Sequence, residues 1–203
     1  MLCGVPRVSD DHLTARREQI LVAARACFLR NGLHTTSMQD LIREAGLSVG
    51  AVYRYFKSKN EIINAIAEGV AGSVTSRIEQ VVTKEPPMPL PEAMSEVLDV
   101  IAAEVEPDGN FRLAVQVWAE ATLDPAIGEI VRERYAAMRD PFRMLARRAA
   151  ERGELPPGAD VDAVGAALFG MIPGFALQRL LIGAPDKETY ADGVRALIAR
   201  PPS

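Results

Sequence analysis

Side chains able to bind phosphate groups or base edges are concentrated between residues 35 and 60. This segment combines hydroxyl groups, aromatic rings and small residues with the cations Arg54 and Lys59. Hydroxyl, guanidinium and ammonium groups donate hydrogen bonds to phosphate oxygens, and arginine also pairs with guanine through two bonds. The two histidines, His12 and His34, have no partners at the spacing of metal ligands, and no hydrolytic set of side chains is recognisable. The residues therefore predict binding chemistry, with no catalytic site, metal or cofactor.

Charge is divided unevenly along the chain. Of the 203 residues, the first 60 contain nine Lys and Arg against five Asp and Glu, whereas the rest contain fourteen against twenty-two. The formal net charge of -4 hides a basic N-terminal third, and a basic patch is the electrostatic footprint that nucleic-acid binding needs. The composition is otherwise that of a globular protein, and a chain of this length buries roughly 70% of its unfolded surface without disulfide staples.

Two short helices must position the candidate binding residues. Thr36 and Gln39 have the spacing of a capping box, in which the Thr36 hydroxyl caps a helix and the Gln39 amide reaches back. Gly46 is expected to end this helix in the left-handed conformation, and Ser48 to cap the next one, which extends to Phe56. Two short helices joined by a tight turn that contains glycine are typical of a helix-turn-helix motif.

In such a motif the second helix enters the major groove of DNA. The residues of this helix that are expected to point away from the protein core include Val49, Gly50, Tyr53 and Arg54. Arg54 is suited to pairing with guanine or holding a phosphate, and Val49 or Ala51 to contacting a thymine methyl group. The sequence therefore predicts that this helix reads double-stranded DNA.

The residues from Leu41 to Lys59 read L-I-R-E-A-G-L-S-V-G-A-V-Y-R-Y-F-K-S-K and follow the run Thr35-Thr36-Ser37. This segment resembles the DNA-binding region of the tetracycline-repressor (TetR) family, whose pattern A-G-[VL]-S-x-G-x-[VLI]-Y-x-[HY]-F-x-[ST]-K fixes many positions. The resemblance covers about residues 14–63. An upstream helix also fits the family at Ile20, Ala23, Ala24, Phe28 and Gly32.

The resemblance implies a homodimeric repressor that a small molecule releases from DNA. It implies phosphate contacts by Thr36, Tyr53, Tyr55 and Lys59, and an approach to the bases by the first residues of the second helix. Together, the residue types and the resemblance place the DNA contacts at Thr36, Ser48, Val49, Gly50, Ala51, Tyr53, Arg54, Tyr55 and Lys59.

Helical periodicity continues to the C-terminus, so the predicted fold class is all-α. Two domains are expected: a three-helix DNA-binding domain over residues 1–59, and a helical domain for ligand binding and dimerisation over residues 60–203. Proline and glycine clusters divide the second domain. About nine helices are expected in total, of which six follow the first domain, over 60–84, 92–105, 110–122, 126–152, 160–182 and 187–199.

Bulky apolar residues of the second domain are candidates for a ligand cavity, which is typically apolar with a few polar groups. If Glu120 faces this cavity, a cationic effector is favoured; otherwise the effector is expected to be largely apolar. The candidate ligand-binding residues are Phe111, Val115, Gln116, Trp118, Glu120, Arg134, Met138, Phe142, Phe169 and Met171.

The segment 160–182 is more apolar than the core of one chain requires, which predicts a face for a second copy. A two-fold dimer would hold two reading helices roughly 34 Å apart and would bind a palindromic operator. The candidate interface residues are Leu168, Ile172, Phe175, Leu180, Val194, Leu197 and Ile198.

No run of about 18 uninterrupted apolar residues is present, so the sequence favours a cytoplasmic protein without a membrane partner. Two alternatives remain open at this point. One is a helical enzyme or scaffold that does not bind DNA. The other is a redox-sensing regulator that uses Cys3 or Cys27, although the position of Cys27 within its helix is that of a core residue.

Overall fold

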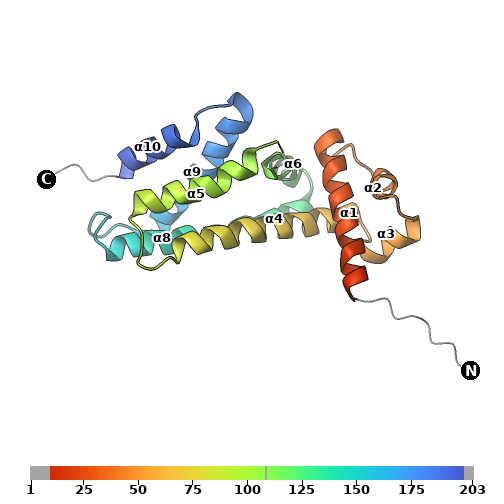
Figure 1. The fold of residues 1–203 in the computed structure, drawn as a ribbon, viewed down its shortest axis with the longest axis horizontal. Helices are drawn as coiled ribbons and strands as arrows, with labels where there is room; N and C mark the ends of the chain where they lie inside the picture. Colours follow the sequence, from red (N-terminus) through yellow and green to blue (C-terminus); the bar gives the residue numbers. More distant parts are fainter. Residues whose placement is uncertain (1–9, 108, 199–203) are drawn as a thin grey trace, which may run out of the picture.

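The computed structural model describes residues 10–107 and 109–198, which form ten α-helices and no strand (Figure 1). The predicted all-α fold class is confirmed. In chain order the helices are α1 (Asp10–Asn31), α2 (Met38–Ala45), α3 (Val49–Tyr55), α4 (Lys59–Val82), α5 (Leu90–Val105), α6 (Phe111–Ala121), α7 (Pro125–Ala137), α8 (Asp140–Glu151), α9 (Val161–Ile182) and α10 (Lys187–Ile198).

The single helix expected over residues 126–152 is wrong, because two helices, α7 and α8, occupy this segment. Pro141 lies in the first turn of α8, where its missing N–H is tolerated. Inside a continuous helix the same ring would clash with the preceding turn and remove a hydrogen bond. The chain therefore ends α7 at Ala137 and begins α8 at Asp140.

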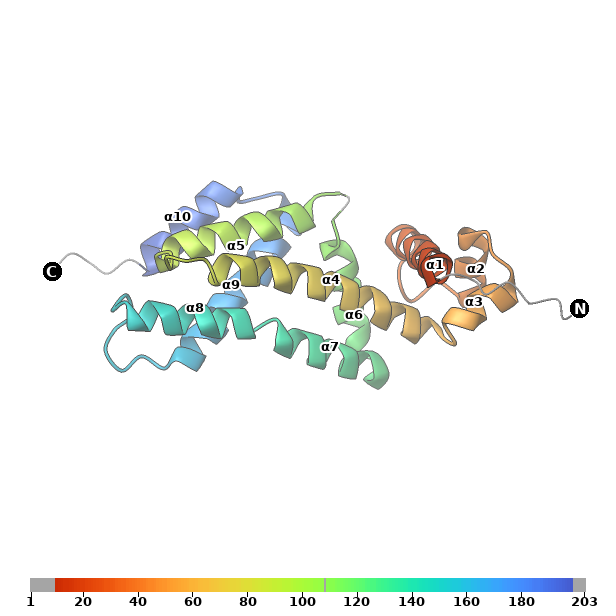
Figure 2. The same ribbon diagram turned by 60° about the horizontal axis from the view of Figure 1, so that its bottom comes forward.

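The first three helices and the start of α4, residues 10–66, form a unit that we call the head. It lies at one end of an elongated molecule, and α4 extends from it along the remaining helices (Figures 1 and 2). Phe28, Leu41, Val52 and Ile62 are all at most 1% exposed at its centre. The same apolar cluster continues into the second part of the chain through Leu113, Val117 and Ile127.

The head therefore shares its core with α6 and α7. Its core also uses Ile62, Ile63 and Ile66 of α4, which lie beyond the domain boundary expected after residue 59. Asn60 adds a polar contact, because its Nδ2 donates to Asp124 Oδ2 over 3.3 Å at the start of α7.

A second core is formed by α4, α5, α8, α9 and α10. Figure 2 shows α7 and α8 on one side of α4, and α5 with α10 on the other. Helices α8 and α9 approach each other closely at Gly165, where an added Cβ would lie 2.9 Å from the Arg143 Cα. Only glycine allows this approach without a shift of one helix.

Helix α9 is long and apolar enough to span a membrane by length and composition, with a mean hydropathy of 1.5 over its best window. One third of that window, 33%, is buried against other helices of the same chain. The fully buried Phe175 and Ala176 belong to this contact surface. Helix α9 thus packs one side into the second core, and Pro173 lies within it without ending it.

Candidate functional site

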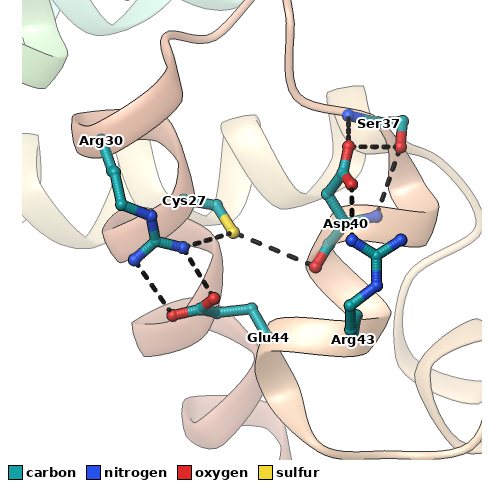
Figure 3. Close-up of polar contacts among 6 residues, drawn as sticks. All are labelled: Cys27, Arg30, Ser37, Asp40, Arg43 and Glu44. Atoms are coloured by element: carbon teal, nitrogen blue, oxygen red, sulfur yellow. Dashed lines mark hydrogen bonds and ion pairs between the residues drawn. The ribbon is translucent and has the colours of Figure 1, made fainter.

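Helix α2 begins one residue later than the spacing of Thr36 and Gln39 predicted. Ser37 is its N-cap: the Ser37 Oγ accepts from the Asp40 N–H over 3.2 Å, and the Asp40 Oδ2 accepts from the Ser37 N–H over 3.0 Å (Figure 3). Thr36 is buried, and its hydroxyl donates to the Gly32 carbonyl over 2.7 Å. The capping box expected from Thr36 and Gln39 is therefore wrong, because the buried Thr36 hydroxyl closes the turn after α1 instead.

The turn between α2 and α3 has the expected geometry. Gly46 adopts φ 63° and ψ 28°, and its N–H donates to the Arg43 carbonyl. The Ser48 Oγ accepts from the Ala51 N–H over 3.3 Å, so Ser48 caps α3 as predicted. These contacts fix two short helices at a defined angle, which is the helix-turn-helix arrangement.

The outer surface of α3 presents Val49, Gly50, Tyr53 and Arg54, and we call these four residues the reading face. Val49 is 60% exposed and Tyr53 is 38% exposed, and both Gly50 and Arg54 are exposed as well. Arg54 forms no ion pair with any described residue, so its guanidinium is available to a ligand. Val52 on the opposite side is fully buried and anchors the helix to the head.

Three predicted DNA contacts have structural partners inside the head. The Lys59 Nζ donates to the carbonyls of Leu33 and Thr36 over 3.1 and 3.2 Å, which ties the loop after α1 to the start of α4. Tyr55 is half-buried and packs against the head core. The hydroxyl of the buried Thr36 is also engaged. These residues hold the reading face in place, whereas Ser48 is exposed and Ala51 half-buried beside that face.

An ion pair joins α1 to α2 within the head. The Arg30 Nη2 lies 2.7 Å from the Glu44 Oε2, and this hydrogen-bonded pair lowers the pKa of Glu44 (Figure 3). Cys27 lies beside this pair and is 1% exposed. Burial, with a further effect from Glu44, raises the pKa of the Cys27 thiol, which keeps it protonated and unreactive. The expectation that Cys27 is a core residue is confirmed; Cys3 lies outside the described residues.

Behind the head, side chains of α4, α5, α6, α7 and α9 enclose a cavity of about 130 Å³. Four aromatic residues form its most distinctive wall. The ring centroids of neighbouring residues lie 5.5 Å apart for Phe111 and Trp118, 5.7 Å for Trp118 and Tyr135, and 4.8 Å for Tyr135 and Phe169, all edge to face. The candidate ligand-binding residues that line this cavity are Phe111, Trp118, Arg134, Met138 and Phe169.

Two polar candidates, Gln116 and Glu120, face the head and do not line the cavity. The Gln116 Oε1 accepts from the Leu33 N–H over 2.9 Å, and the Glu120 Oε1 lies 3.7 Å from the His34 Nδ1. The condition for a cationic effector, that Glu120 faces the cavity, is not met. The other candidates outside the lining are Val115, Phe142 and Met171, of which Phe142 is buried in the second core.

The sequence reasoning missed most of the cavity lining. The α4 part of the lining could have been found from the sequence, since small and apolar residues recur there every three to four positions and face the cavity. Burial raises the pKa of the Tyr135 hydroxyl, which stays a neutral donor. The missed residues are Ile66, Ala67, Val70, Ala71, Val74, Ile101, Glu104, Asn110, Leu113, Ala114, Val117, Val131, Tyr135, Ile172 and Pro173.

A chain of polar contacts connects the cavity wall to the head. The Arg77 Nη1 donates to Glu104 Oε1 over 3.0 Å, and the Asn110 Nδ2 donates to Glu104 Oε2 over 2.7 Å. The Asn110 Oδ1 in turn accepts from the Arg25 guanidinium of α1. Asn110 occupies the N-cap position of α6, yet its side chain forms no capping bond because it is engaged in this chain.

Most of the predicted dimer-interface residues are buried within one chain. Leu168, Ile172, Phe175 and Val194 are at most 5% exposed and pack into the second core, so they offer almost no surface to a second copy. Leu180 and Ile198 are half-buried. The exposed apolar residues at this end of the molecule are Leu181, Ile182 and Leu197, with 73%, 71% and 77% of their surface exposed.

The head and the cavity define a helix-turn-helix protein with a ligand-sized space behind its DNA-binding unit. Residues 20–66 match the family model for bacterial regulatory proteins of the tetR family, and residues 92–200 match that for the BetI-type transcriptional repressor C-terminal domain. The chain belongs to the TetR family of transcriptional regulators. It is a DNA-binding transcriptional regulator rather than an enzyme.

Known relatives agree with this assignment. The regulator UidR of Escherichia coli K12 is 24% identical over 182 residues, which are 90% of either chain. Salmonella enterica GusR superposes with a TM-score of 0.77 at 22% identity, covering 94% of this chain and 96% of the other. A structure of SmeT with triclosan has a TM-score of 0.77 at 24% identity, with coverage of 93% and 96%. The structural likeness supports the fold.

Proposed function

We propose that the protein is a dimeric cytoplasmic repressor that binds a palindromic operator and is released from it by a small-molecule effector. The reading face supplies the chemistry for base contacts: the Arg54 guanidinium suits guanine, and Val49 suits a thymine methyl group. Ser48 and Ala51 lie beside it. The cavity supplies a second site at a distance from the reading face.

The contact between Asn110 and Arg25 carries the proposal. Asn110 lines the cavity and at the same time holds α1 of the head. An effector that prefers a different position of Asn110 would weaken this contact and change the orientation of the head. Only such a difference in affinity between two conformations shifts their populations. Asn110 therefore couples the cavity to the head directly, beside the apolar core that the two regions share.

Dimerisation is supported by the exposed apolar residues of α9 and α10. Leu181, Ile182 and Leu197 are more than 70% exposed although they are large and apolar. A second copy related by two-fold symmetry would cover both sets of residues at once. The same symmetry would present two α3 helices to half-sites roughly 34 Å apart, one turn of the DNA helix.

Arg54→Ala tests the DNA-binding part of the proposal. We expect its affinity for a palindrome selected from a random duplex pool to fall about 5- to 150-fold, since one bidentate base contact contributes roughly 1–3 kcal/mol. Fluorescence anisotropy at several salt concentrations measures this affinity. Arg147→Ala is the matched control, because it removes the same charge from an exposed position on α8. Equal loss in both variants, or equal binding of the palindrome and a scrambled duplex, would contradict the proposal.

Asn110→Ala tests the coupling. Compounds that raise the melting temperature of the wild-type protein bind its folded state, and we expect those that occupy the cavity to weaken operator binding. In Asn110→Ala such compounds should still raise the melting temperature but have a much smaller effect on operator affinity. Unchanged release from DNA in this variant would rule out Asn110 as the connection.

A further inference from the structure

The cavity has the size of a single aromatic ring. Its volume is about 130 Å³, and an engineered protein cavity of about 150 Å³ is known to bind benzene. A bicyclic or longer compound would need the surrounding helices to move apart. The volume thus sets an upper limit on the part of a ligand that the cavity encloses in this conformation.

The walls of the cavity suit a planar aromatic group. Phe111, Trp118, Tyr135 and Phe169 form a continuous edge-to-face series across α6, α7 and α9. Aromatic rings prefer offset or edge-to-face partners, and each such pair contributes about 0.5–1.5 kcal/mol beyond its buried area. A further ring inserted against this series would gain the same type of contact.

Arg134 provides an unused hydrogen-bond donor at this wall. Its Nε is buried and has no hydrogen-bond partner among the described residues. Its Nη2 lies 3.8 Å from the Glu68 Oε1, too far for a hydrogen bond, and that carboxylate belongs to a largely exposed side chain. A buried donor without a partner is costly, and a guanidinium matches the geometry of a carboxylate. The site therefore favours a ligand that supplies an oxygen acceptor.

The charges on the opposite wall disfavour a cationic ligand. Glu104 is the only acidic side chain among the described residues that line the cavity. Both of its oxygens are already bound, one by Arg77 over 3.0 Å and the other by Asn110 over 2.7 Å. An ammonium group would have to displace one of these partners, whereas an anion at Arg134 competes only with the 3.8 Å ion pair to the largely exposed Glu68.

We propose that the cavity binds a single-ring aromatic anion of the benzoate or phenolate type, whose oxygen accepts hydrogen bonds from Arg134. The ring lies against the aromatic series, and the anionic group is held by the guanidinium. This inference deepens the proposed function, on which it rests, by naming the chemical class of the effector.

Trp118 provides a direct readout, because it is the only tryptophan of the chain and it lines the cavity. Titrations of the full-length protein that follow its fluorescence should use benzoate, the neutral amide benzamide, toluene and the cation benzylamine as probes. We expect the affinity for benzoate to exceed that for toluene at least roughly tenfold, because a hydrogen bond to a charged group contributes about 1.5–3 kcal/mol. Benzamide should be intermediate, and benzylamine the weakest.

Arg134→Gln should remove the advantage of benzoate and leave toluene binding unchanged. Arg132→Gln on the same helix is the control, since the Arg132 side chain is 72% exposed and does not line the cavity. Benzoate affinity that is unchanged in Arg134→Gln would overturn the proposal. If that variant does not fold, the wild-type series still decides, because equal binding of benzoate and toluene, or tighter binding of benzylamine, would also overturn it.

The same probes separate the two proposals. Benzoate that binds with the expected dependence on Arg134 but leaves operator affinity unchanged would support the ligand class and contradict effector-driven release. If none of the four probes binds while operator affinity depends on Arg54, the ligand class is wrong and the DNA-binding function stands.

Discussion

The head and the cavity differ in how their residues are brought together. In the head, the contacts that cap the short helices and start α4 join residues three positions apart, as in Ser37 with Asp40 and Ser58 with Glu61. In the cavity, the aromatic series joins Trp118 to Tyr135 and Tyr135 to Phe169, which belong to three different helices. A local motif thus shapes one site and tertiary packing the other.

This difference fits the proposed function of each site. A reading face must keep one geometry on a regular duplex, and helix caps between residues close in sequence stabilise that geometry. A cavity whose walls come from five helices changes shape when those helices shift. A ligand that prefers one of these shapes therefore changes the arrangement of the helices outside the cavity as well. Helix α6 belongs to both regions, because Asn110 lies at the cavity and Gln116 contacts the loop after α1.

Phe28→Ala should have the largest effect and would test whether the two regions are separate. Phe28 is fully buried, and its truncation should lower the free energy of unfolding by about 3–5 kcal/mol. Because the head shares its core with α6 and α7, we expect one unfolding transition in urea, shifted as a whole. Far-UV circular dichroism and Trp118 fluorescence, which report on the helices and on the cavity, should shift together.

The neighbouring Leu29→Ala is the control for this prediction. Leu29 is 37% exposed on the same helix, and its truncation should cost much less than that of Phe28. Two transitions in Phe28→Ala, with the fluorescence midpoint unchanged, would show that the head unfolds alone and that the shared core does not couple the regions.

Gly165→Ala should have an intermediate effect that originates on the cavity side of the molecule. The added Cβ would lie 2.9 Å from the Arg143 Cα, so α8 and α9 must separate, at a cost of about 1–3 kcal/mol. Gly72→Ala in α4 is the matched control, because nothing lies within 4 Å of its added Cβ. Alanine favours the helix there and should stabilise the protein slightly. Thermal unfolding of both variants measures the contrast, and equal melting temperatures would contradict it.

The sequence predicted the head better than the cavity for the same physical reason. Gly46 and Ser48 act within a single turn of chain, so their types and spacing were sufficient to place them. The one-residue error at Thr36 arose because both threonine and serine can cap a helix. Burial of Thr36 against Gly32 decides between them, and burial is not visible in the sequence.

To predict the cavity lining and the dimer interface, one must know which side of each helix faces the core. Leu168 and Phe175 were expected to contact a second copy, but α9 is apolar on several sides, so its sequence did not show which side faces the core. Arg134 and Glu120 were both candidates for the cavity because of their residue types. Arg134 lines the cavity, whereas the packing of α6 against the head turns Glu120 toward His34. Pro141 did give a local signal, and it divides α7 from α8.

Ser37→Ala should have the smallest effect, and it tests whether a local cap fixes the start of α2. Loss of the cap should destabilise the protein by about 1 kcal/mol. In the wild type the Ser37 hydroxyl and N–H donate to Asp40 and hold the pKa of that carboxyl below its ordinary value of 3.8. The variant should move this pKa upward toward 3.8, which NMR titration of the Asp40 carboxyl measures.

The sign of the pH dependence follows from that shift. A carboxyl whose pKa is lowered in the folded state stabilises the fold above its unfolded pKa, and this stabilisation is lost as the pH falls through the folded pKa. The difference between the wild type and Ser37→Ala should therefore be largest near neutral pH and decrease in acid. Ser73→Ala, which alters an exposed serine of α4, should show neither the pKa change nor the pH dependence. An Asp40 pKa that stays unchanged in Ser37→Ala would mean that the cap does not hold this carboxylate, and that the start of α2 is fixed by tertiary packing, as the cavity is.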